Sequence, residues 1–326
     1  MRYVIGVDLG GTKFAVGAMA ADGSAVHAFQ SQLTQAADGA DAVIARIADL
    51  VQSVIAQAMA ETGAARSDFV GVGIGAPGPL RRADGVVVVA PNLGWHDVPL
   101  RDALGARVGL PATLDNDAKC ATLGEAWIGA AQGAQTAVGV TLGTGIGGGL
   151  ILNGRLHYGA SDVAGEIGHT TIETAGRRCK CGNYGCLEAY ASGPAIAQRT
   201  REALEAGDTP SSLRAMDPAD LTAQHVYDAA QHDDEIARDV VRDTARYLGA
   251  GVANLLNLFN PEVVVLAGGV AAAGEQLFAP LRAEVRRRAF RPAVDAARIV
   301  PGLLGPRAGM IGAVAAFRVE RPDLVA

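Results

Sequence analysis

The chain has 326 residues, of which 49% are hydrophobic and 5% aromatic, and it carries a formal net charge of −6 at pH 7. The length favours two domains, and the composition excludes a fibrous or largely disordered chain. Because a net negative charge gives no general field that attracts DNA phosphates or an anionic membrane surface, we expect neither nucleic acid nor a membrane as a partner.

The N-terminal part predicts strands followed by a helix. Residues 3–33 contain three β-rich segments separated by GGTK and DG, and residues from about Ala40 to Ala60 have the apolar spacing of a helix. The first strand starts at Tyr3 without a preceding secretory signal pattern, and no run reaches the about 18 apolar residues of a membrane span. We therefore expect a cytoplasmic protein, in which clustered cysteines hold metal more often than they form disulfides.

The next predicted strands end at polar residues. DFVGVGIGAPGP predicts a buried strand that stops at a Gly/Pro turn, and PATLDNDAKCATLGEAWIGA predicts a short strand that runs into a helix near Asp117. Site residues of α/β folds lie at such junctions, so Asp117 and the adjacent Asn116 are candidates. An aspartate at this position is also an ordinary helix cap, and the sequence leaves both interpretations open.

The opening pattern returns later in the chain. IGVDLG at residues 5–10 matches VGVTLG at residues 138–143, and each copy continues through a glycine turn into a second apolar strand. We interpret this as one β-turn-β unit used twice, once in each domain.

The remaining elements alternate. The sequence predicts a long helix in DEIARDVVRDTARYLGAGVANLLNLF, a strand in PEVVVLAGG, a helix from about Ala272 to Arg288, a strand in ARIVPGLLG and a last helix in RAGMIGAVAAFRV. Such alternation predicts α/β layers with ligands at the strand ends.

Three glycine turns follow predicted strands, in DLGGTK, LGTGIGGG and LAGGVAAAG. Glycine lets backbone N–H groups approach an anion closely, and in the first turn Thr12 adds a hydroxyl and Lys13 a charge. A single glycine turn is more often only a hairpin, but its duplication favours a nucleotide site. Gly143, Gly145 and Gly148 fit G-x-G-x-x-G, yet a strand pattern follows where a dinucleotide site needs a helix, and the sequence contains no Walker motif.

Three of the four cysteines and one histidine gather in GHTTIETAGRRCKCGNYGCLEAY. His169, Cys179, Cys181 and Cys186 offer four nitrogen and sulfur ligands with no evident open position, which is typical of a structural tetrahedral zinc site. Unrelated reduced thiols are the alternative. We interpret Cys120, on the helix predicted after Asp117, as an ordinary packed side chain.

Two carboxylates flank the candidate ligands. Glu166 precedes His169 and Glu188 follows Cys186, so a zinc-fixed loop would project both carboxylates in defined directions. A metal that performs no chemistry stiffens such a loop and reduces the cost of ordering it around a polar ligand.

Seven motifs occur in order across nearly the whole chain: DLGGTK, GAPGP, APNLGW, DNDA, LGTGIGGG, GEIGH and CKCGNYGCLE. This set resembles the bacterial ROK family (repressors, open reading frames and sugar kinases), and within it the zinc-containing glucokinases. The resemblance implies an α/β, two-domain actin-like ATPase (ribonuclease H-like) fold with an interdomain cleft. Residues 1–117 with 307–326 would form the N-terminal domain, and residues 118–306 the larger domain with the zinc loop. It also implies ATP-dependent phosphorylation of a hexose, most similar to glucose at its 6-hydroxyl, by a homodimer or homotetramer.

The resemblance also assigns roles to residues. Asp117 resembles the general base, and the sugar ligands would be Gly78, Asn92, Asn116, Asp117, Glu166, His169 and Glu188. Asp8 would hold Mg²⁺ through water. The ATP phosphates and adenosine would be bound by Gly10, Gly11, Thr12, Lys13, Gly143, Thr144, Gly145, Gly268 and Gly269. Structural Zn²⁺ would be held by His169, Cys179, Cys181 and Cys186, with His169 offering its second ring nitrogen to the sugar.

Two alternatives stay open on the sequence. The first is a ROK kinase for another hexose, such as N-acetylglucosamine, N-acetylmannosamine, mannose or fructose, because the same polar side chains recognise hydroxyl patterns that these sugars share in part. The second is a sugar-binding regulator, which needs a helix-turn-helix segment before the first strand. Since that strand starts at Tyr3, we favour the kinase.

Overall fold

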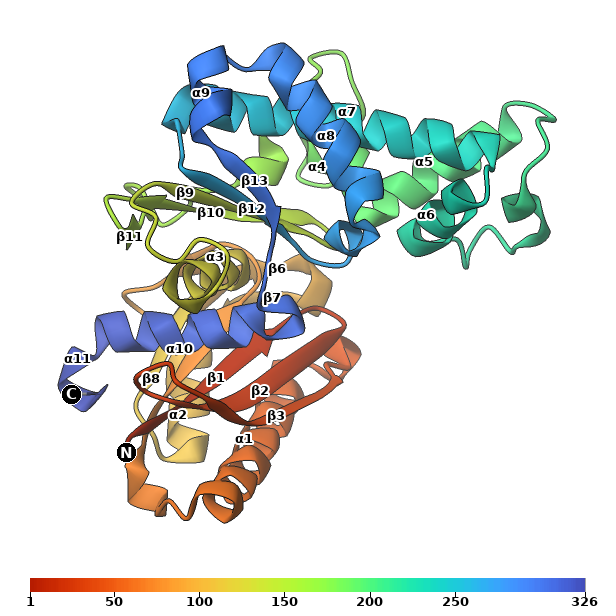
Figure 1. Cartoon of the computed structure of the whole chain (residues 1–326). Coiled ribbons are helices and arrows are strands. Elements are labelled where there is room, and N and C mark those ends of the chain that lie inside the picture. Colours follow the sequence, from red (N-terminus) through yellow and green to blue (C-terminus); the bar gives the residue numbers. More distant parts are fainter. Residues whose placement is uncertain (326) are drawn as a thin grey trace. The chain divides into compact units, whose positions relative to one another are not determined.

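Two five-stranded sheets organise residues 1–325, which the computed structural model describes (Figure 1). In spatial order, the first contains β3 (Val26–Leu33), β2 (Lys13–Ala20), β1 (Tyr3–Leu9), β4 (Phe69–Ala76) and β8 (Ala112–Asn116). The second contains β11 (Arg155–Leu156), β10 (Ile146–Leu152), β9 (Ala137–Leu142), β12 (Val263–Ala267) and β13 (Arg298–Pro301). In each sheet the central strand pairs antiparallel with its hairpin partner and parallel with the next long strand. This shared topology confirms the repeat seen in the sequence.

The chain divides into two compact units, one around each sheet. Unit 1 contains Met1–Gly133, Leu156–Ala164 and the residues from Leu304 on, and unit 2 contains Ala134–Arg155 and Gly165–Leu303. The C-terminal residues thus belong to the same unit as the N-terminal sheet.

Helices cover both faces of the sheet in unit 1. α1 (Ala40–Thr62) and α2 (Leu100–Val108) share a core with the strand residues that face them, such as Ile5 and Val7. α10 (Ala308–Glu320) packs with Val4 on the opposite face, as expected for a strand whose successive side chains point to opposite sides. Gly73 permits this packing, because a Cβ at that position would lie 2.0 Å from the Ala313 carbonyl oxygen.

Among the described residues, α1 is the one helix long and apolar enough to cross a membrane by length and composition. Its apolar side chains, including Val43, Ile47, Val51 and Val54, are fully buried in the core of unit 1. We therefore interpret α1 as a core helix.

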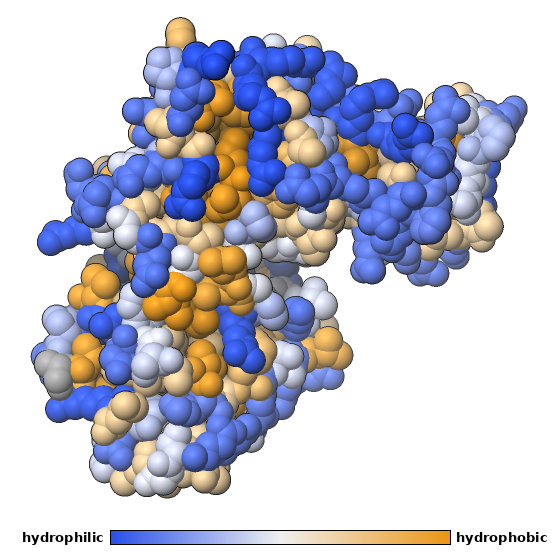
Figure 2. Space-filling model, in the orientation of Figure 1, coloured by the Kyte–Doolittle hydropathy of each residue, from blue (hydrophilic) through white to orange (hydrophobic). Residues whose placement is uncertain are grey.

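Unit 2 places a helical layer on its sheet. The helices are α4 (Glu188–Ala191), α5 (Gly193–Glu205), α6 (Ala223–Gln231), α7 (Glu235–Phe259), α8 (Glu275–Arg288) and α9 (Arg291–Ala296). Apolar side chains of α7 and α8, such as Leu248 and Leu281, share one core with Val140 and Val264 of the strands. Hydrophilic residues dominate the visible surface of the part that holds α5 and α6 (Figure 2).

The division into units differs from the boundary that we placed at residue 117. α3 (Asp117–Ile128) belongs to unit 1 because it packs closely on α10: a Cβ at Gly312 would lie 1.6 Å from the Cys120 carbonyl oxygen. Unit 1 therefore extends to Gly133, and it also takes in the segment Leu156–Ala164.

Several features of the local structure were not predicted. A small antiparallel sheet of β5 (Leu80–Arg81), β6 (Val86–Ala90) and β7 (Trp95–Val98) follows β4. The helices α2, α4 to α6, α9 and α11 (Pro322–Val325) were also missed. The helix expected from Ala272 begins only at Glu275, because Gly274 adopts a left-handed φ of 59° after a short 3₁₀ turn.

Candidate functional site

Most of the candidate residues of unit 1 lie at or just after the carboxyl ends of β1, β4 and β8. These three strands are parallel neighbours, with Asp8 paired to Gly75 and Ala76 paired to Asn116. Because parallel strands end at the same edge of a sheet, the residues that follow them come together there. Asn116 donates from Nδ2 to the Gly78 carbonyl oxygen at 3.5 Å, which joins the ends of two strands.

Asn116, and not Asp117, is the N-cap of α3. The Asn116 Oδ1 accepts hydrogen bonds from the Ala118 and Lys119 amides, both at 3.1 Å. Asp117 is the first residue of the helix, and its Oδ1 also accepts from the Ala118 amide at 2.7 Å. Because the Asn116 side chain already caps α3, the need for a helix cap does not by itself explain the carboxylate of Asp117.

Asp8 lies in a strongly perturbed environment. Burial and, to a smaller extent, the nearby Asp117 carboxylate raise its pKa from 3.8 to about 7, a shift that Lys13 opposes. The Asp8 carboxylate also lies against the first turn of α10, where a Cβ on Gly309 would be 2.3 Å from its Oδ2. The carboxylates of Asp8 and Asp117 repel each other, and a divalent cation, which prefers oxygen ligands, would relieve that repulsion.

The first glycine turn is fixed by a neighbouring strand. The Thr34 hydroxyl donates to the Gly10 carbonyl oxygen at 2.7 Å, and the Thr34 amide donates to the Thr12 carbonyl oxygen at 2.8 Å. Gly11 lies against Asn92, whose Cβ would be 2.8 Å from a Cβ at position 11. The structure thus brings Asn92 beside this turn, while the side chains of Thr12 and Lys13 stay exposed.

The two glycine turns of unit 2 lie at one sheet edge. β9 and β12 are parallel, and Ala267 pairs with Thr141 just before both turns begin. Gly268 requires the absence of a side chain, because its φ is +96° and a Cβ would lie 2.5 Å from the Leu142 carbonyl oxygen. At Gly143 and Gly269, by contrast, a Cβ would meet no atom within 4 Å, so both turns expose backbone to open space.

The four predicted zinc ligands come together within unit 2. The ligand atoms of His169, Cys179, Cys181 and Cys186 all lie within 4.8 Å of one another. The Sγ atoms of Cys181 and Cys186 are 3.7 Å apart, and the Cys179 Sγ is 3.8 Å from the His169 Nδ1. A tetrahedral ion with Zn–S bonds of about 2.3 Å needs sulfur atoms about 3.8 Å apart. The donor set therefore fits zinc in both chemistry and spacing.

Close packing holds this loop in shape. Gly185 has a φ of +73°, and a Cβ there would lie 1.7 Å from the Glu173 carbonyl oxygen. Bridges join Thr171 to Cys186 and Arg178 to Tyr184. A side chain at Gly185 would therefore clash with the Glu173 backbone.

Glu188 links the zinc loop to the second glycine turn. Its Oε2 accepts a hydrogen bond from the Ile146 amide at 2.9 Å, and its Oε1 is 3.8 Å from the Cys179 Sγ. A Cβ at Gly145 would lie 2.6 Å from the same Oε2. Glu188, which we expected as a sugar ligand, therefore also positions the turn of Gly143 to Gly145.

The other two candidates of unit 2 lie on a short 3₁₀ helix. η4 (Ile167–His169) follows Glu166 and packs on β10, since a Cβ at Gly168 would lie 2.1 Å from the Ile146 carbonyl oxygen. Glu166 is exposed and His169 is half-buried. His169 turns its Nδ1 to Cys179, so Nε2 lies on the opposite side of the ring.

Sequence reasoning missed a supporting arginine. The buried Arg199 of α5 donates from Nη1 to the Tyr190 carbonyl oxygen at 3.0 Å and to the Thr244 hydroxyl at 2.9 Å. It thereby fixes the end of α4, which begins with Glu188. An arginine beside Ile196 and Thr200 on a buried helix face was the available signal.

A cavity lies elsewhere in unit 2. It measures about 590 Å³, and its lining runs from Ala230 of α6 to Pro280 of α8 and includes Asp233, Arg238, Asp239 and Arg242. Each of these arginines has a carboxylate partner, at 3.0 Å for Arg238 and 2.9 Å for Arg242. Because it contains none of the candidate residues and its arginines already pair with carboxylates, we do not assign the site to it.

Comparisons with known proteins agree on one family. A sequence model described as the ROK family matches residues 4–320. A glucokinase of Thermotoga maritima is 39% identical over 320 residues, covering 97% of each chain. The crystal structure of a ROK hexokinase from Thermus thermophilus superposes with a TM-score of 0.82 at 34% identity, covering 99% of this chain and 100% of that one. A ROK glucokinase from Streptomyces griseus in complex with glucose and AMPPNP gives a TM-score of 0.82 at 34% identity, covering 96% and 98%.

Proposed function

This chain belongs to the ROK family, and from that premise we propose that it is an ATP-dependent hexokinase that phosphorylates glucose at its 6-hydroxyl. The observation that carries the proposal is the Asp117 carboxylate at the end of β8, close enough to Asp8 to raise its pKa, in a chain that is similar over nearly its whole length to proteins named glucokinase. The actin-like two-unit α/β architecture supports the same activity.

In the proposed reaction, the oxygen of the sugar 6-hydroxyl attacks the terminal phosphorus of ATP, and Asp117 accepts the proton of that hydroxyl. The new oxygen–phosphorus bond replaces the bond to the leaving oxygen of ADP, and the proton stays on the Asp117 carboxylate until it passes to solvent. A positioned general base contributes about 10²- to 10⁴-fold in rate, and the rest comes from alignment and charge neutralisation.

We assign the phosphates to the glycine turns of both units. Exposed Thr12 and Lys13 with Gly10 and Gly11 would bind them in unit 1, and Gly143, Thr144 and Gly145 in unit 2. Gly268 and Gly269 would approach the adenosine. Asp8 would hold Mg²⁺, which when bound neutralises phosphate charge, and the cation would return the Asp8 carboxylate to its ionised form.

We assign the sugar to residues of both units. In unit 1 these are Gly78, Asn92, Asn116 and Asp117, and in unit 2 they are Glu166, His169 and Glu188. His169, Cys179, Cys181 and Cys186 would hold a zinc ion, whose contribution is to fix the ring of His169 and the loop that leads to Glu188.

Two further properties belong to the proposal. We place the enzyme in the cytoplasm, where reduced thiols stay available to a metal. We also expect a homodimer or homotetramer, as the resemblance to ROK kinases implies. Sedimentation of the purified protein measures the second property directly.

A coupled assay across hexoses and phosphoryl donors tests the function. We expect the highest kcat/KM with glucose and ATP, and lower values with mannose, fructose, N-acetylglucosamine and N-acetylmannosamine. Sites built on hydroxyl contacts discriminate strongly, since a missing partner leaves buried polar groups unpaired. A higher kcat/KM with another hexose would replace the substrate assignment, and turnover of no hexose with ATP or polyphosphate would refute the kinase assignment.

Gly309 offers a test of the Asp8 assignment. In Gly309→Ala the new methyl group would meet the Asp8 carboxylate at 2.3 Å and displace it. We expect kcat/KM for ATP to fall by about 10²-fold, the cost of a displacement of about 1 Å in a reacting site, with little change in the KM for glucose. Gly207→Ala is the matched control, because a Cβ there meets nothing within 4 Å. Wild-type kinetics in Gly309→Ala would show that Asp8 does not serve the nucleotide.

A further inference from the structure

One segment of the chain leaves unit 2 and folds onto unit 1. Residues Leu156–Ala164 start at the last residue of β11 of the second sheet but belong to the first unit, and the chain re-enters unit 2 at Gly165. We call Leu156–Ala164 the strap. Its contacts in unit 1 centre on Asp115 and Lys119, which flank Asn116 and Asp117 along the chain.

A hydrogen bond to a buried carboxylate anchors the strap. The Tyr158 hydroxyl donates to the Asp115 Oδ2 at 2.5 Å, and the Asp115 Oδ1 accepts from the Asn116 amide at 2.8 Å. Only 2% of Asp115 is exposed, so this carboxylate depends on protein groups for its partners. The strap residue Tyr158 is therefore bonded to the residue directly before the proposed site.

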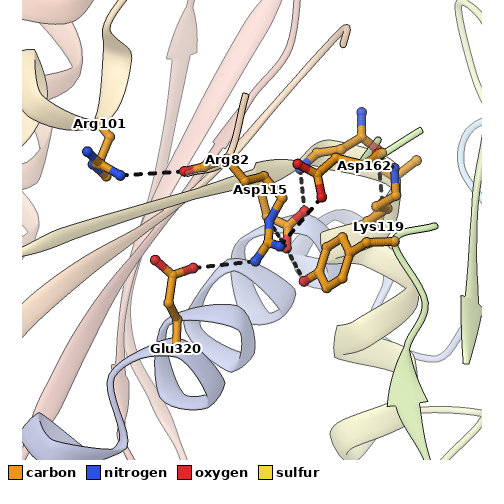
Figure 3. A network of polar contacts seen from close by, with 9 residues as sticks. Arg82, Arg101, Asp115, Lys119, Asp162 and Glu320 are labelled. Carbon is orange, nitrogen blue, oxygen red and sulfur yellow. Dashed lines mark hydrogen bonds and ion pairs between the residues drawn. The ribbon is translucent and has the colours of Figure 1, made fainter. Parts of the chain in front are cut away.

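Arg82 reinforces the anchor from the other side. Its Cζ lies 3.7 Å from the centroid of the Tyr158 ring, and its Nε is 3.5 Å from the Asp115 Oδ2. Figure 3 shows the same guanidinium among three carboxylates, with Nη2 3.4 Å from Glu320 of α10 and Nη1 3.9 Å from Asp162 of the strap. A planar guanidinium suits this role because it stacks on a ring and pairs with carboxylates at once.

A second contact fixes the far end of the strap. Lys119 is 2% exposed, and its ammonium donates to the Asp162 carbonyl oxygen at 2.8 Å. Within the strap, the Ala164 amide donates to the Tyr158 carbonyl oxygen at 3.0 Å. Both ends of the strap are thus bonded to side chains next to Asp117.

The covalent chain extends this restraint to Glu166. Glu166 is two residues after Ala164, and two residues span at most about 7 Å. A strap held by Asp115 and Lys119 therefore limits where Glu166 can lie, and release of the strap removes that limit.

We propose that the strap is a positioning device for the sugar, in which Tyr158, Arg82, Asp115 and Lys119 hold the segment that leads to Glu166 beside the turn that carries Asp117. The inference rests on the proposed function for its kinetic readout. None of the four residues is among the sugar ligands that we assign above. We expect nucleotide binding to be independent of the strap, because none of the strap hydrogen bonds described above reaches a glycine turn.

The test removes one anchor at a time. Tyr158→Phe deletes the hydroxyl and keeps the ring, and Lys119→Met deletes the ammonium and keeps a side chain of similar shape. Tyr227→Phe is the matched control, since its buried hydroxyl has no hydrogen-bond partner within residues 1–325. Each variant is examined by hydrogen exchange of the strap amides and by steady-state kinetics with the hexose that the wild type prefers.

We expect strap exchange in Tyr158→Phe and Lys119→Met to rise about tenfold, the change that follows loss of one hydrogen bond to a charged group. The sugar KM rises by a similar factor while the KM for ATP stays within twofold, and Tyr227→Phe matches the wild type. Unchanged exchange overturns the anchor, and raised exchange with an unchanged sugar KM overturns the positioning role. An equal rise in both KM values also overturns it, because it indicates general loss of structure. A wild type that phosphorylates no hexose would refute the proposed function instead, while the exchange measurement still tests the anchor.

Discussion

Asp117→Asn lowers kcat by about 10²- to 10⁴-fold and leaves the affinity for glucose within about threefold of wild type. An amide cannot accept the proton of the attacking hydroxyl, so the contribution of a general base is lost. Sugar binding persists because the asparagine keeps the shape of the side chain and its oxygen can still accept the hydrogen bond that the Ala118 amide donates to residue 117. Helix α3 also keeps its cap, which is Asn116. Steady-state kinetics gives kcat, and calorimetric titration with glucose gives the affinity.

The control for this variant is Asp41→Asn. Asp41 also lies in the first turn of a helix, and its exposed side chain pairs with Arg107. Surface pairs of this kind contribute little, so we expect wild-type kinetics. If the kcat of Asp117→Asn stays within tenfold of wild type, Asp117 is not the base.

Cys181→Ser abolishes stoichiometric zinc binding and raises the KM for glucose by about tenfold or more. Removal of one thiolate leaves three ligands and releases the ring of His169, whose Nδ1 faces Cys179. Cys181 is the exposed member of the set, so the substitution removes a ligand without opening a cavity. Atomic absorption measures the zinc content, and kinetics measures the KM.

Cys120→Ala is the matched control for the zinc variant. Cys120 is buried in α3 beside Gly75 and lies outside the ligand set. We expect it to lose some stability and to keep its zinc. Chelation of zinc from the wild type should also lower Tm, because a bound ion stabilises the folded loop. Wild-type protein that purifies without about one zinc per chain would contradict the assignment.

The parts of the site that depend on local sequence were predictable. The ligands from Cys179 to Cys186 are close along the chain, so their spacing alone predicted a cluster that the structure brings together. Asn116 and Asp117 were predictable because an apolar strand and a helical pattern meet at that point, although the capping residue proved to be Asn116. The repeated hairpin was visible because each copy is continuous.

Contacts between distant residues could not be predicted in the same way. Arg82, Asp115, Tyr158 and Glu320 meet only because the strand order and the return of the C-terminal helix bring them together. No local pattern distinguishes Arg82 from the neighbouring exposed Arg81. The domain boundary was misplaced for a related reason, because the attachment of α3 to unit 1 depends on small residues of α10 that are far away in the sequence.

The place of α10 in unit 1 has a consequence for biosynthesis. The ribosome completes β1 to β8 first and unit 2 next, but the helix that covers Val4, Met19 and the β4 glycines is made last. One apolar face of the N-terminal sheet therefore stays uncovered until translation ends. Unit 2 is synthesised completely before that point. We expect nascent chains stopped before Leu304 to bind chaperones through that face. In this chain unit 2 would then fold before unit 1, whereas N-terminal domains usually fold first.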